Sequence, residues 1–189
     1  MTPQEPAPLP DPWITTASRV VYENPWISVR EDDVLRADGS PGIYGVVSMR
    51  NLALGAVPLF ADGTTVLVGQ HRYTFDTWTW ECPEGGGDPA RGVLPEIARE
   101  LREETGLVAA RWSPLGELQT SNSICDERAL LFLAEDLEQR EPLPEPTEQL
   151  LLWRLPLADA VAMAVDGRIT DAMSVAALLR ADAVVRDRG

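Results

Sequence analysis

The chain has 189 residues, 44% of them hydrophobic, and a formal net charge of −14. This length and hydrophobic content predict one domain with an ordinary buried core. The acidic balance argues against binding to nucleic acid or to an anionic membrane, because both need a basic surface. All 16 strong bases are arginines, so recognition of an anionic substrate would depend on metal ions and a few well-placed arginines.

The sequence favours a cytoplasmic protein. No apolar run approaches the roughly 20 residues of a membrane span, and the start MTPQEPAPLPDPW lacks the basic and apolar regions of a signal peptide. Cys82 and Cys125 are too few for a disulfide framework and lack the spacing of a metal site, so we expect two reduced thiols. His71 is the single histidine, which argues against a His-based zinc site and a Ser-His-Asp hydrolase.

The N-terminal part of the chain is predicted to be mostly strand. Residues 1–17 are rich in proline and acid and predict an extended arm. Residues 18–50 contain strand-like alternation and a Gly/Ser/Pro turn, which predict an N-terminal β subdomain or hairpin. The main domain is expected over 51–189, and it begins with two strands joined by a turn at Asp62-Gly63.

The second half of the chain combines strands with two late helices. Strands are expected over 112–120, 129–134 and 150–155, an exposed acidic loop over 135–148, and helices over 157–165 and from a cap at Thr170 to about 185. With the central helix described next, this order predicts an α/β fold in which a mixed sheet lies between helices.

The stretch from Gly85 to Leu107 places a glycine run directly before a helix rich in carboxylates. Proline at 95 suits a first helical turn and glycine at 106 suits a C-terminal cap, so we expect a helix over 94–105. At about 100° per residue, the side chains divide into an apolar side with Leu94, Ile97, Ala98 and Leu101 and an acid face with Glu96, Glu100, Glu103 and Glu104. Like charges at i,i+4 cost about 0.2–0.5 kcal/mol per pair. The acid face therefore either stays solvated or binds a cation.

A metal ion between the glycine run and the helix would account for this pattern. Mg²⁺ prefers oxygen ligands and keeps waters or substrate phosphates in its shell. Glu100, Glu103 and Glu104 supply three carboxylates from adjoining positions on one helical face. The segment Glu84–Gly87 predicts a tight turn whose backbone can approach that face. On composition alone, a solvated acid face is the alternative.

The spacing of Gly85 and the segment 99–107 resembles the Nudix box, the signature of Nudix hydrolases: G, five residues, E, seven residues, then REUxEExGU with U aliphatic. One position departs from it, because Arg91 stands where the family has its first glutamate. Three stretches, residues 70–72 with 80–85, 120–127 and 167–178, resemble the ADP-ribose and nucleoside-diphosphate-sugar pyrophosphatase branch, although Asn122 replaces a proline that marks many ADP-ribose enzymes.

The resemblance implies a Nudix-type α/β/α sandwich and a homodimer formed through the N-terminal region. It also implies Mg²⁺-dependent hydrolysis, with Mn²⁺ as the alternative metal, of the pyrophosphate bond of ADP-ribose or a nucleoside-diphosphate sugar. The products would be a nucleoside monophosphate and a sugar phosphate. The implied metal ligands are Glu100, Glu104, Glu103 and the backbone carbonyl of Glu84.

The resemblance further assigns substrate contacts and a general base. Arg72 would reach the substrate phosphates, and Trp26 and Tyr44 would flank the nucleobase, with hairpin packing as the alternative for both aromatic residues. The base tends to come from a late loop, where Glu148 is the nearest match and Glu127 its rival, although either could be a solvated loop carboxylate. Glu103 is counted among both the metal ligands and the catalytic residues.

Two other functions fit parts of the sequence. Arg91 supports a nucleotide-sugar sensor that kept the fold and lost catalysis, but no basic helix-turn-helix segment is visible before Ser18 or after Gly167. A Nudix enzyme that cleaves dinucleoside polyphosphates or NADH is disfavoured by the ADP-ribose-type flanks of the box.

Overall fold

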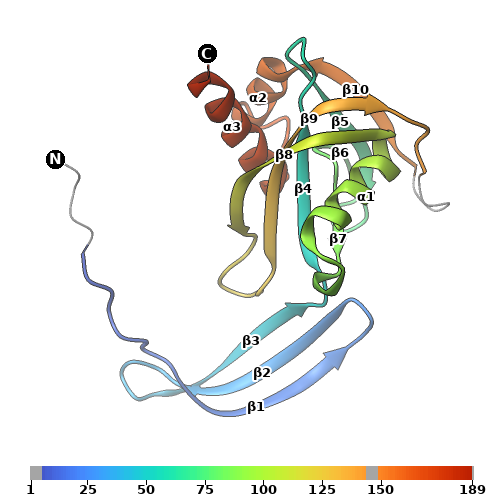
Figure 1. Ribbon diagram of the computed structural model, residues 1–189. Coiled ribbons are helices and arrows are strands. Elements are labelled where there is room, and N and C mark those ends of the chain that lie inside the picture. The colour runs from blue at the N-terminus through green and yellow to red at the C-terminus, as the bar shows by residue number, and fades with distance from the viewer. Residues whose placement is uncertain (1–5, 144–148, 189) are drawn as a thin grey trace. The chain divides into compact units, whose positions relative to one another are not determined.

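The computed structural model describes residues 6–143 and 149–188 (Figure 1). Within these residues lie ten strands, one 3₁₀ turn (η1) and three α-helices. The N-terminal elements are β1 (Ile14–Glu23), β2 (Ile27–Leu35), β3 (Pro41–Met49), β4 (Leu52–Pro58), β5 (Thr64–Arg72), β6 (Thr77–Glu81) and β7 (Glu84–Gly87). They are followed by η1 (Pro89–Arg91), α1 (Val93–Thr105), β8 (Leu107–Gln119), β9 (Arg128–Gln139), β10 (Leu151–Pro156), α2 (Leu157–Val165) and α3 (Ala172–Asp187).

The chain divides into two compact units. The first holds β1, β2 and β3, together with the segment Ser123–Asp126, and the second holds all the other elements. In the first unit the three strands form an antiparallel sheet in the order β1-β2-β3. Strand β1 begins at Ile14, opposite Leu35. The extended arm expected over 1–17 therefore ends before Ile14, because residues 14–17 belong to strand β1.

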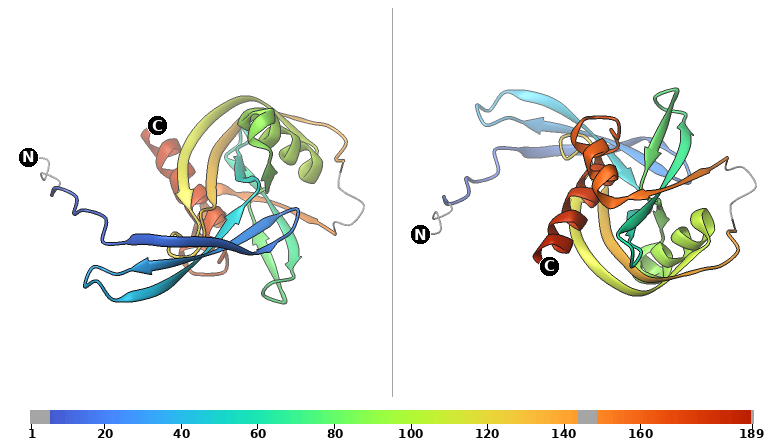
Figure 2. Two further views of the ribbon diagram at one scale, coloured as in Figure 1. Left: turned by 90° about the horizontal axis from the view of Figure 1, so that it is seen from below. Right: turned by 90° about the horizontal axis from the view of Figure 1, so that it is seen from above.

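The second unit has the α/β/α layering that the sequence predicted. Its four-stranded sheet has the order β7-β4-β9-β8, in which β4 and β9 are parallel and the other pairs antiparallel. Figure 2 shows α1 on one side of β4 and β9 and α2 with α3 on the other. Because side chains alternate along a strand, Leu54 and Ala56 pack with Ile97 of α1, whereas Val57 packs with residues of α2 and α3. The predicted fold class is confirmed.

A second antiparallel sheet, in the order β10-β5-β6, presents two different faces. One face carries Gln70, Arg72, Thr79 and Glu81, which are linked by hydrogen bonds. On the other face the rings of Trp78 and Trp80 meet edge to face. This sheet thus places a polar cluster directly before the segment that enters β7.

Three sequence expectations for these elements are wrong. The loop expected to start at residue 135 is still strand, because β9 runs to Gln139 and its buried Glu135 is paired with Arg111 and Arg188. Helix α3 is capped by Asp171, not Thr170, since the Asp171 carboxylate accepts the Ser174 amide at 2.6 Å. The glycine run is strand β7 rather than a tight turn, because it pairs with β4 from Leu52 to Gly55. In the described part of the chain no helix is long and apolar enough to cross a membrane.

Candidate functional site

Helix α1 forms where the sequence predicted it and ends as expected. Gly106 adopts the left-handed conformation with φ of 72°, and its amide donates to the Arg102 carbonyl. Ile97 and Leu101 are fully buried. In the first turn, however, Val93 packs against the core and Leu94 is 47% exposed, so the prediction that Leu94 lies on the packed side is wrong.

The acid face of α1 is neither solvated nor uniform. Arg99, from the same helix, lies among the carboxylates: its Nη1 is 2.5 Å from Glu103, and its Nη2 is 2.6 Å from Glu100 and 3.3 Å from Glu96. The same Nη2 donates to the Gly86 carbonyl of β7 at 3.3 Å. Burial alone would lower the pKa of Arg99, but the charge of Glu100 and the other carboxylates raises it. An internal arginine therefore already offsets part of the repulsion between the glutamates.

Strand β7 lies directly against this helix. The backbone amide of Glu84 donates to Oε2 of Glu104 at 3.0 Å. A side chain at Gly85 would have its Cβ 2.5 Å from Oε2 of Glu100, so any residue other than glycine would displace this carboxylate from the strand. The predicted meeting of the glycine run and the carboxylates is thus present, although a strand makes it.

The donors around Gly85 fit a hard divalent cation. Oε2 of Glu84 is buried and has no hydrogen-bond partner among the described residues, and Glu100 and Glu104 reach the same strand. Such an all-oxygen set is what Mg²⁺ and Mn²⁺ prefer. Within the described residues no three His, Cys, Asp or Glu side chains are already arranged to hold a metal ion. Arg99 binds two of the carboxylates that a metal would need.

The Glu84 side chain is unusual because it is buried beside other acids. Burial raises the pKa of Glu84 well above its ordinary value, and the nearby charges of Asp171 and Glu81 raise it further. Arg72 acts in the opposite direction, since its Nη2 is 2.5 Å from Oε1 of Glu84. The strand that carries the candidate metal donors is therefore linked through Glu84 to the polar face of the second sheet.

Arg72 occupies the centre of that polar face. Its Nε and Nη2 donate to the carboxylate of Glu81, with distances of 2.5–3.0 Å, and its Nη2 also contacts Glu84. Burial alone would lower the pKa of Arg72, but the hydrogen bond to Glu81 and the charge of Glu84 raise it. Arg72 thus lies beside the box, as its proposed substrate role requires, and that role stays a prediction.

Sequence reasoning gave Glu81 no function of its own. The signal was the alternation along two paired strands: Gln70 and Arg72 share one face of β5, and Thr79 and Glu81 share the adjoining face of β6. Period-two alternation of polar residues on neighbouring strands predicts such a cluster, but only once the strand pairing is known.

Arg91, the residue that departs from the box signature, has two acidic neighbours. Its guanidinium is 3.9 Å from Asp88 and 3.9 Å from Glu96. Its side chain is 68% exposed, whereas Glu96 is buried and also accepts the amide of Asp88 at 3.3 Å. The positive charge of Arg91 therefore lies at the loop that precedes α1.

The two aromatic residues expected to hold a nucleobase do not face each other within one chain. Trp26, just before β2, accepts the Arg50 amide, just after β3. Tyr44 of β3 pairs with Asp32 of β2, which is six residues after Trp26. At about 3.4 Å per residue, they are roughly 20 Å apart. Tyr44 packs edge-on against Trp13 at a centroid distance of 5.3 Å, and Trp26 is 69% exposed. Their roles stay predictions.

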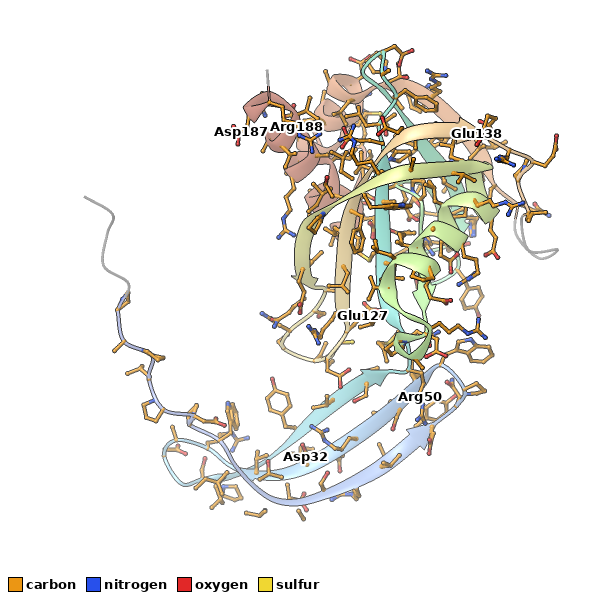
Figure 3. All side chains as sticks on the ribbon, viewed as in Figure 1. Asp32, Arg50, Glu127, Glu138, Asp187 and Arg188 are labelled. Atoms are coloured by element: carbon orange, nitrogen blue, oxygen red, sulfur yellow. The ribbon has the colours of Figure 1, made fainter. Side chains whose placement is uncertain are left out.

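Of the two candidates for the general base, only Glu127 is among the described residues, because Glu148 lies outside them. Glu127 directly precedes β9 and accepts the Thr120 hydroxyl at 2.7 Å. Figure 3 shows Glu127 and Glu138 toward opposite ends of this strand. Ala53 of β4 pairs with Gly86 on one side and Ala129 on the other, so Glu127 lies at the end of the sheet that carries the glycine run.

A cavity of about 680 Å³ lies elsewhere in the second unit. It is lined in part by Phe60, Arg111, Glu135, Leu157 and Asp182, and none of its lining residues belongs to β7 or α1. Its charged groups are paired with one another or with neighbours. This cavity is therefore separate from the carboxylates of α1.

Comparisons with known proteins give matches over most of the chain. Residues 49–176 match the model of the NUDIX domain, and residues 13–47 match that of the nucleoside diphosphate sugar hydrolase N-terminal domain. An ADP-ribose pyrophosphatase of Mycobacterium tuberculosis is 31% identical over 179 residues, which cover 90% of this chain and 83% of the relative.

An ADP-ribose pyrophosphatase of Bacillus subtilis is 27% identical over 87% of this chain and 89% of its own length. Among solved structures, a crystal structure of an ADP compounds hydrolase superposes with a TM-score of 0.84 at 23% identity, covering 97% of this chain and 99% of that one. The structural likeness supports the α/β/α architecture described above.

Proposed function

Because this chain belongs to the Nudix family and is a pyrophosphohydrolase, we propose that it uses Mg²⁺ to split ADP-ribose or a nucleoside-diphosphate sugar. The products are a nucleoside monophosphate and a sugar phosphate. The matches to ADP-ribose pyrophosphatases support the substrate class. The observation that carries the proposal is the contact of β7 with the carboxylates of α1, in which Glu104 accepts the Glu84 amide and Gly85 leaves room for Glu100.

In this proposal the metal is held by the carboxylates of Glu100 and Glu104, with Glu103 and the backbone carbonyl of Glu84 completing the protein donors. When bound, Mg²⁺ would neutralise pyrophosphate oxygens and acidify a water molecule. Arg99 keeps Glu100 and Glu103 in place through an ion pair with each. Mn²⁺ has the same preference for oxygen ligands and is the alternative metal.

The remaining roles concern substrate and proton transfer. Arg72 donates charge-assisted hydrogen bonds to the pyrophosphate, and its position beside Glu84 supports this role. Glu127 or Glu148 removes a proton from the attacking water, a step worth about 10²–10⁴ in rate. Trp26 or Tyr44 offers an aromatic ring to the nucleobase, and one base cannot contact both rings of a single chain because they lie roughly 20 Å apart.

A panel of substrates with Mg²⁺ tests this function. ADP-ribose, GDP-mannose and a UDP-sugar should release a nucleoside monophosphate, with ADP-ribose giving AMP and ribose phosphate. Turnover of dinucleoside polyphosphates or NADH alone would favour the other hydrolase activity. Binding of ADP-ribose without turnover at tens of millimolar Mg²⁺ would favour a sensor. Mn²⁺ in place of Mg²⁺ serves as the control for metal identity.

We also propose that the chain forms a homodimer through its N-terminal sheet. Strand β1 is an edge strand of the sheet, and all ten of its residues are exposed, including Ile14, Val20, Val21 and Tyr22 at 54–62%. An open edge with apolar side chains favours association with another chain. Sedimentation equilibrium should give twice the monomer mass for the parent and the monomer mass for Val20→Glu. A monomeric parent would contradict the proposal.

A further inference from the structure

Glu81 is a buried carboxylate, and within the described part of the chain its hydrogen bonds come from one face of β5 and β6. It is 2% exposed. Its Oε1 accepts the Thr79 hydroxyl at 2.7 Å and its Oε2 accepts the Gln70 amide at 3.2 Å. Nε and Nη2 of Arg72 complete the set. A carboxylate removed from water needs such compensation, and here three side chains provide it.

The arrangement fixes one edge of the Arg72 guanidinium. Nε and Nη2 are engaged by Glu81, and Nη2 also by Glu84. Among the described residues, none accepts a hydrogen bond from Nη1 of Arg72, although the side chain is only 38% exposed. A guanidinium is planar and rigid, so fixing the Nε–Nη2 edge also fixes the direction in which the two Nη1 hydrogens point.

We infer that Glu81 is a positioning residue that clamps Arg72 so that its Nη1 is presented to the pyrophosphate of the substrate. Glu81 itself touches no substrate, since it is buried behind Arg72 and its oxygens are fully used. Thr79 and Gln70 support the clamp by holding the Glu81 carboxylate in one orientation. This inference rests on the proposed function, in which Arg72 binds the substrate phosphates.

Without Glu81, the ion pair with Glu84 is the one that the guanidinium keeps among the described residues. It would then rotate toward that residue, and Nη1 would lose its fixed direction. Misplacement of a binding group by about 1 Å is enough to cost a large factor in rate. The substitution Glu81→Gln keeps the shape of the side chain and removes its charge, so it tests the clamp with little change in packing.

A double-mutant cycle with ADP-ribose and Mg²⁺ separates positioning from a general structural role. We expect Arg72→Ala and Glu81→Gln each to lower kcat/KM about tenfold or more. The double variant Arg72→Ala/Glu81→Gln should be no worse than Arg72→Ala within about twofold, because the clamp has no function once Arg72 is gone. Glu138→Gln, at an exposed carboxylate paired with Arg140, is the matched control and should retain the parent rate.

Thr79→Val keeps every charge and removes one hydrogen bond to Glu81, so it replaces Glu81→Gln in the cycle if that variant does not fold. Thr79→Val should lower kcat/KM by a smaller factor than Glu81→Gln, and this loss should likewise disappear when Arg72 is alanine. Parent-like kinetics for Glu81→Gln, or an equal factor lost with and without Arg72, would overturn the inference while leaving the proposed function intact.

The failure of the proposed function gives a different result. Parent-like kinetics for Arg72→Ala would remove the assigned role of Arg72 and the clamp with it. A parent that binds ADP-ribose without turnover would contradict the hydrolase activity alone. The cycle is then measured on the Kd for ADP-ribose by calorimetry, and the effects of the two substitutions on Kd should again be non-additive. A parent that neither binds nor hydrolyses ADP-ribose overturns both.

Discussion

Arg91 brings a positive charge to the loop before a helix that gathers carboxylates. It lies 3.9 Å from Asp88 and 3.9 Å from Glu96, and Glu96 precedes the candidate donor Glu100 by about one turn of α1. At about 8 Å and an effective dielectric near 20, one unit charge changes the energy of a bound unit charge by about 2 kcal/mol. Since Arg91 is largely exposed, solvent and salt screen much of this electrostatic energy.

We therefore expect an active enzyme with a raised Mg²⁺ requirement. Arg91→Gln should lower the Mg²⁺ concentration for half-maximal hydrolysis about twofold and Arg91→Glu about fourfold, because the second change alters the local charge by two units instead of one. A Mg²⁺ titration of the initial rate checks this, with Arg102→Gln, on the exposed side of the same helix, as control. An equal or higher requirement in Arg91→Glu would contradict the assignment.

Glu84 makes stability depend on pH in a predictable direction. Its pKa in the folded chain is raised by burial and by the charges of Asp171 and Glu81. The unfolded chain loses this proton near the ordinary value, so stability is full below that value and falls as pH rises through the folded pKa. Glu84→Gln should therefore gain stability relative to the parent as pH rises above that ordinary value. Urea unfolding with EDTA measures this, and a difference that does not change with pH would argue against it.

Strand β7 and helix α1 form the site only because their backbones approach closely. Gly85→Ala would place a Cβ 2.5 Å from the Glu100 carboxylate, which must then move away. We expect Gly85→Ala to lower kcat/KM at least about tenfold. Gly86→Ala is a matched control on the same strand, because its Cβ would meet only the Asn51 side chain at 3.3 Å. Equal rates for the two variants would mean that the strand does not position Glu100.

Among the elements, those with local signals were predictable from the sequence. Helix α1 ends at Gly106 and α2 spans 157–165 as expected, because caps and periodicity lie within the segments themselves. The glycine run was misassigned because its strand character depends on pairing with β4. The extension of β9 was missed because Glu135 is compensated by two arginines that lie 24 and 53 residues away along the chain.

At the scale of the whole molecule, the spacing of the box predicted that carboxylates of α1 meet the glycine run, and Glu100 and Glu104 do so. The prediction did not include Arg99, which forms ion pairs with Glu96, Glu100 and Glu103. From the sequence alone, the acid face of α1 could equally be solvated or bind a metal ion. The separation of Trp26 and Tyr44 was also hidden, since it follows from the register of β2 and β3. Site geometry that depends on strand pairing was therefore beyond reach of the sequence alone.

The most direct test of the account is the rate of ADP-ribose hydrolysis by Glu100→Gln and Glu104→Gln across a Mg²⁺ titration. The hydrolysis rate of each variant should be at least about 100-fold below that of the parent at any Mg²⁺ concentration, a loss of about 2.7 kcal/mol in transition-state stabilisation. Their fold should persist, because Arg99 keeps its pairs with Glu96 and Glu103 and a glutamine at 104 can still accept the Glu84 amide. Glu138→Gln should match the parent. Parental rates in both box variants would show that these carboxylates do not hold the catalytic metal.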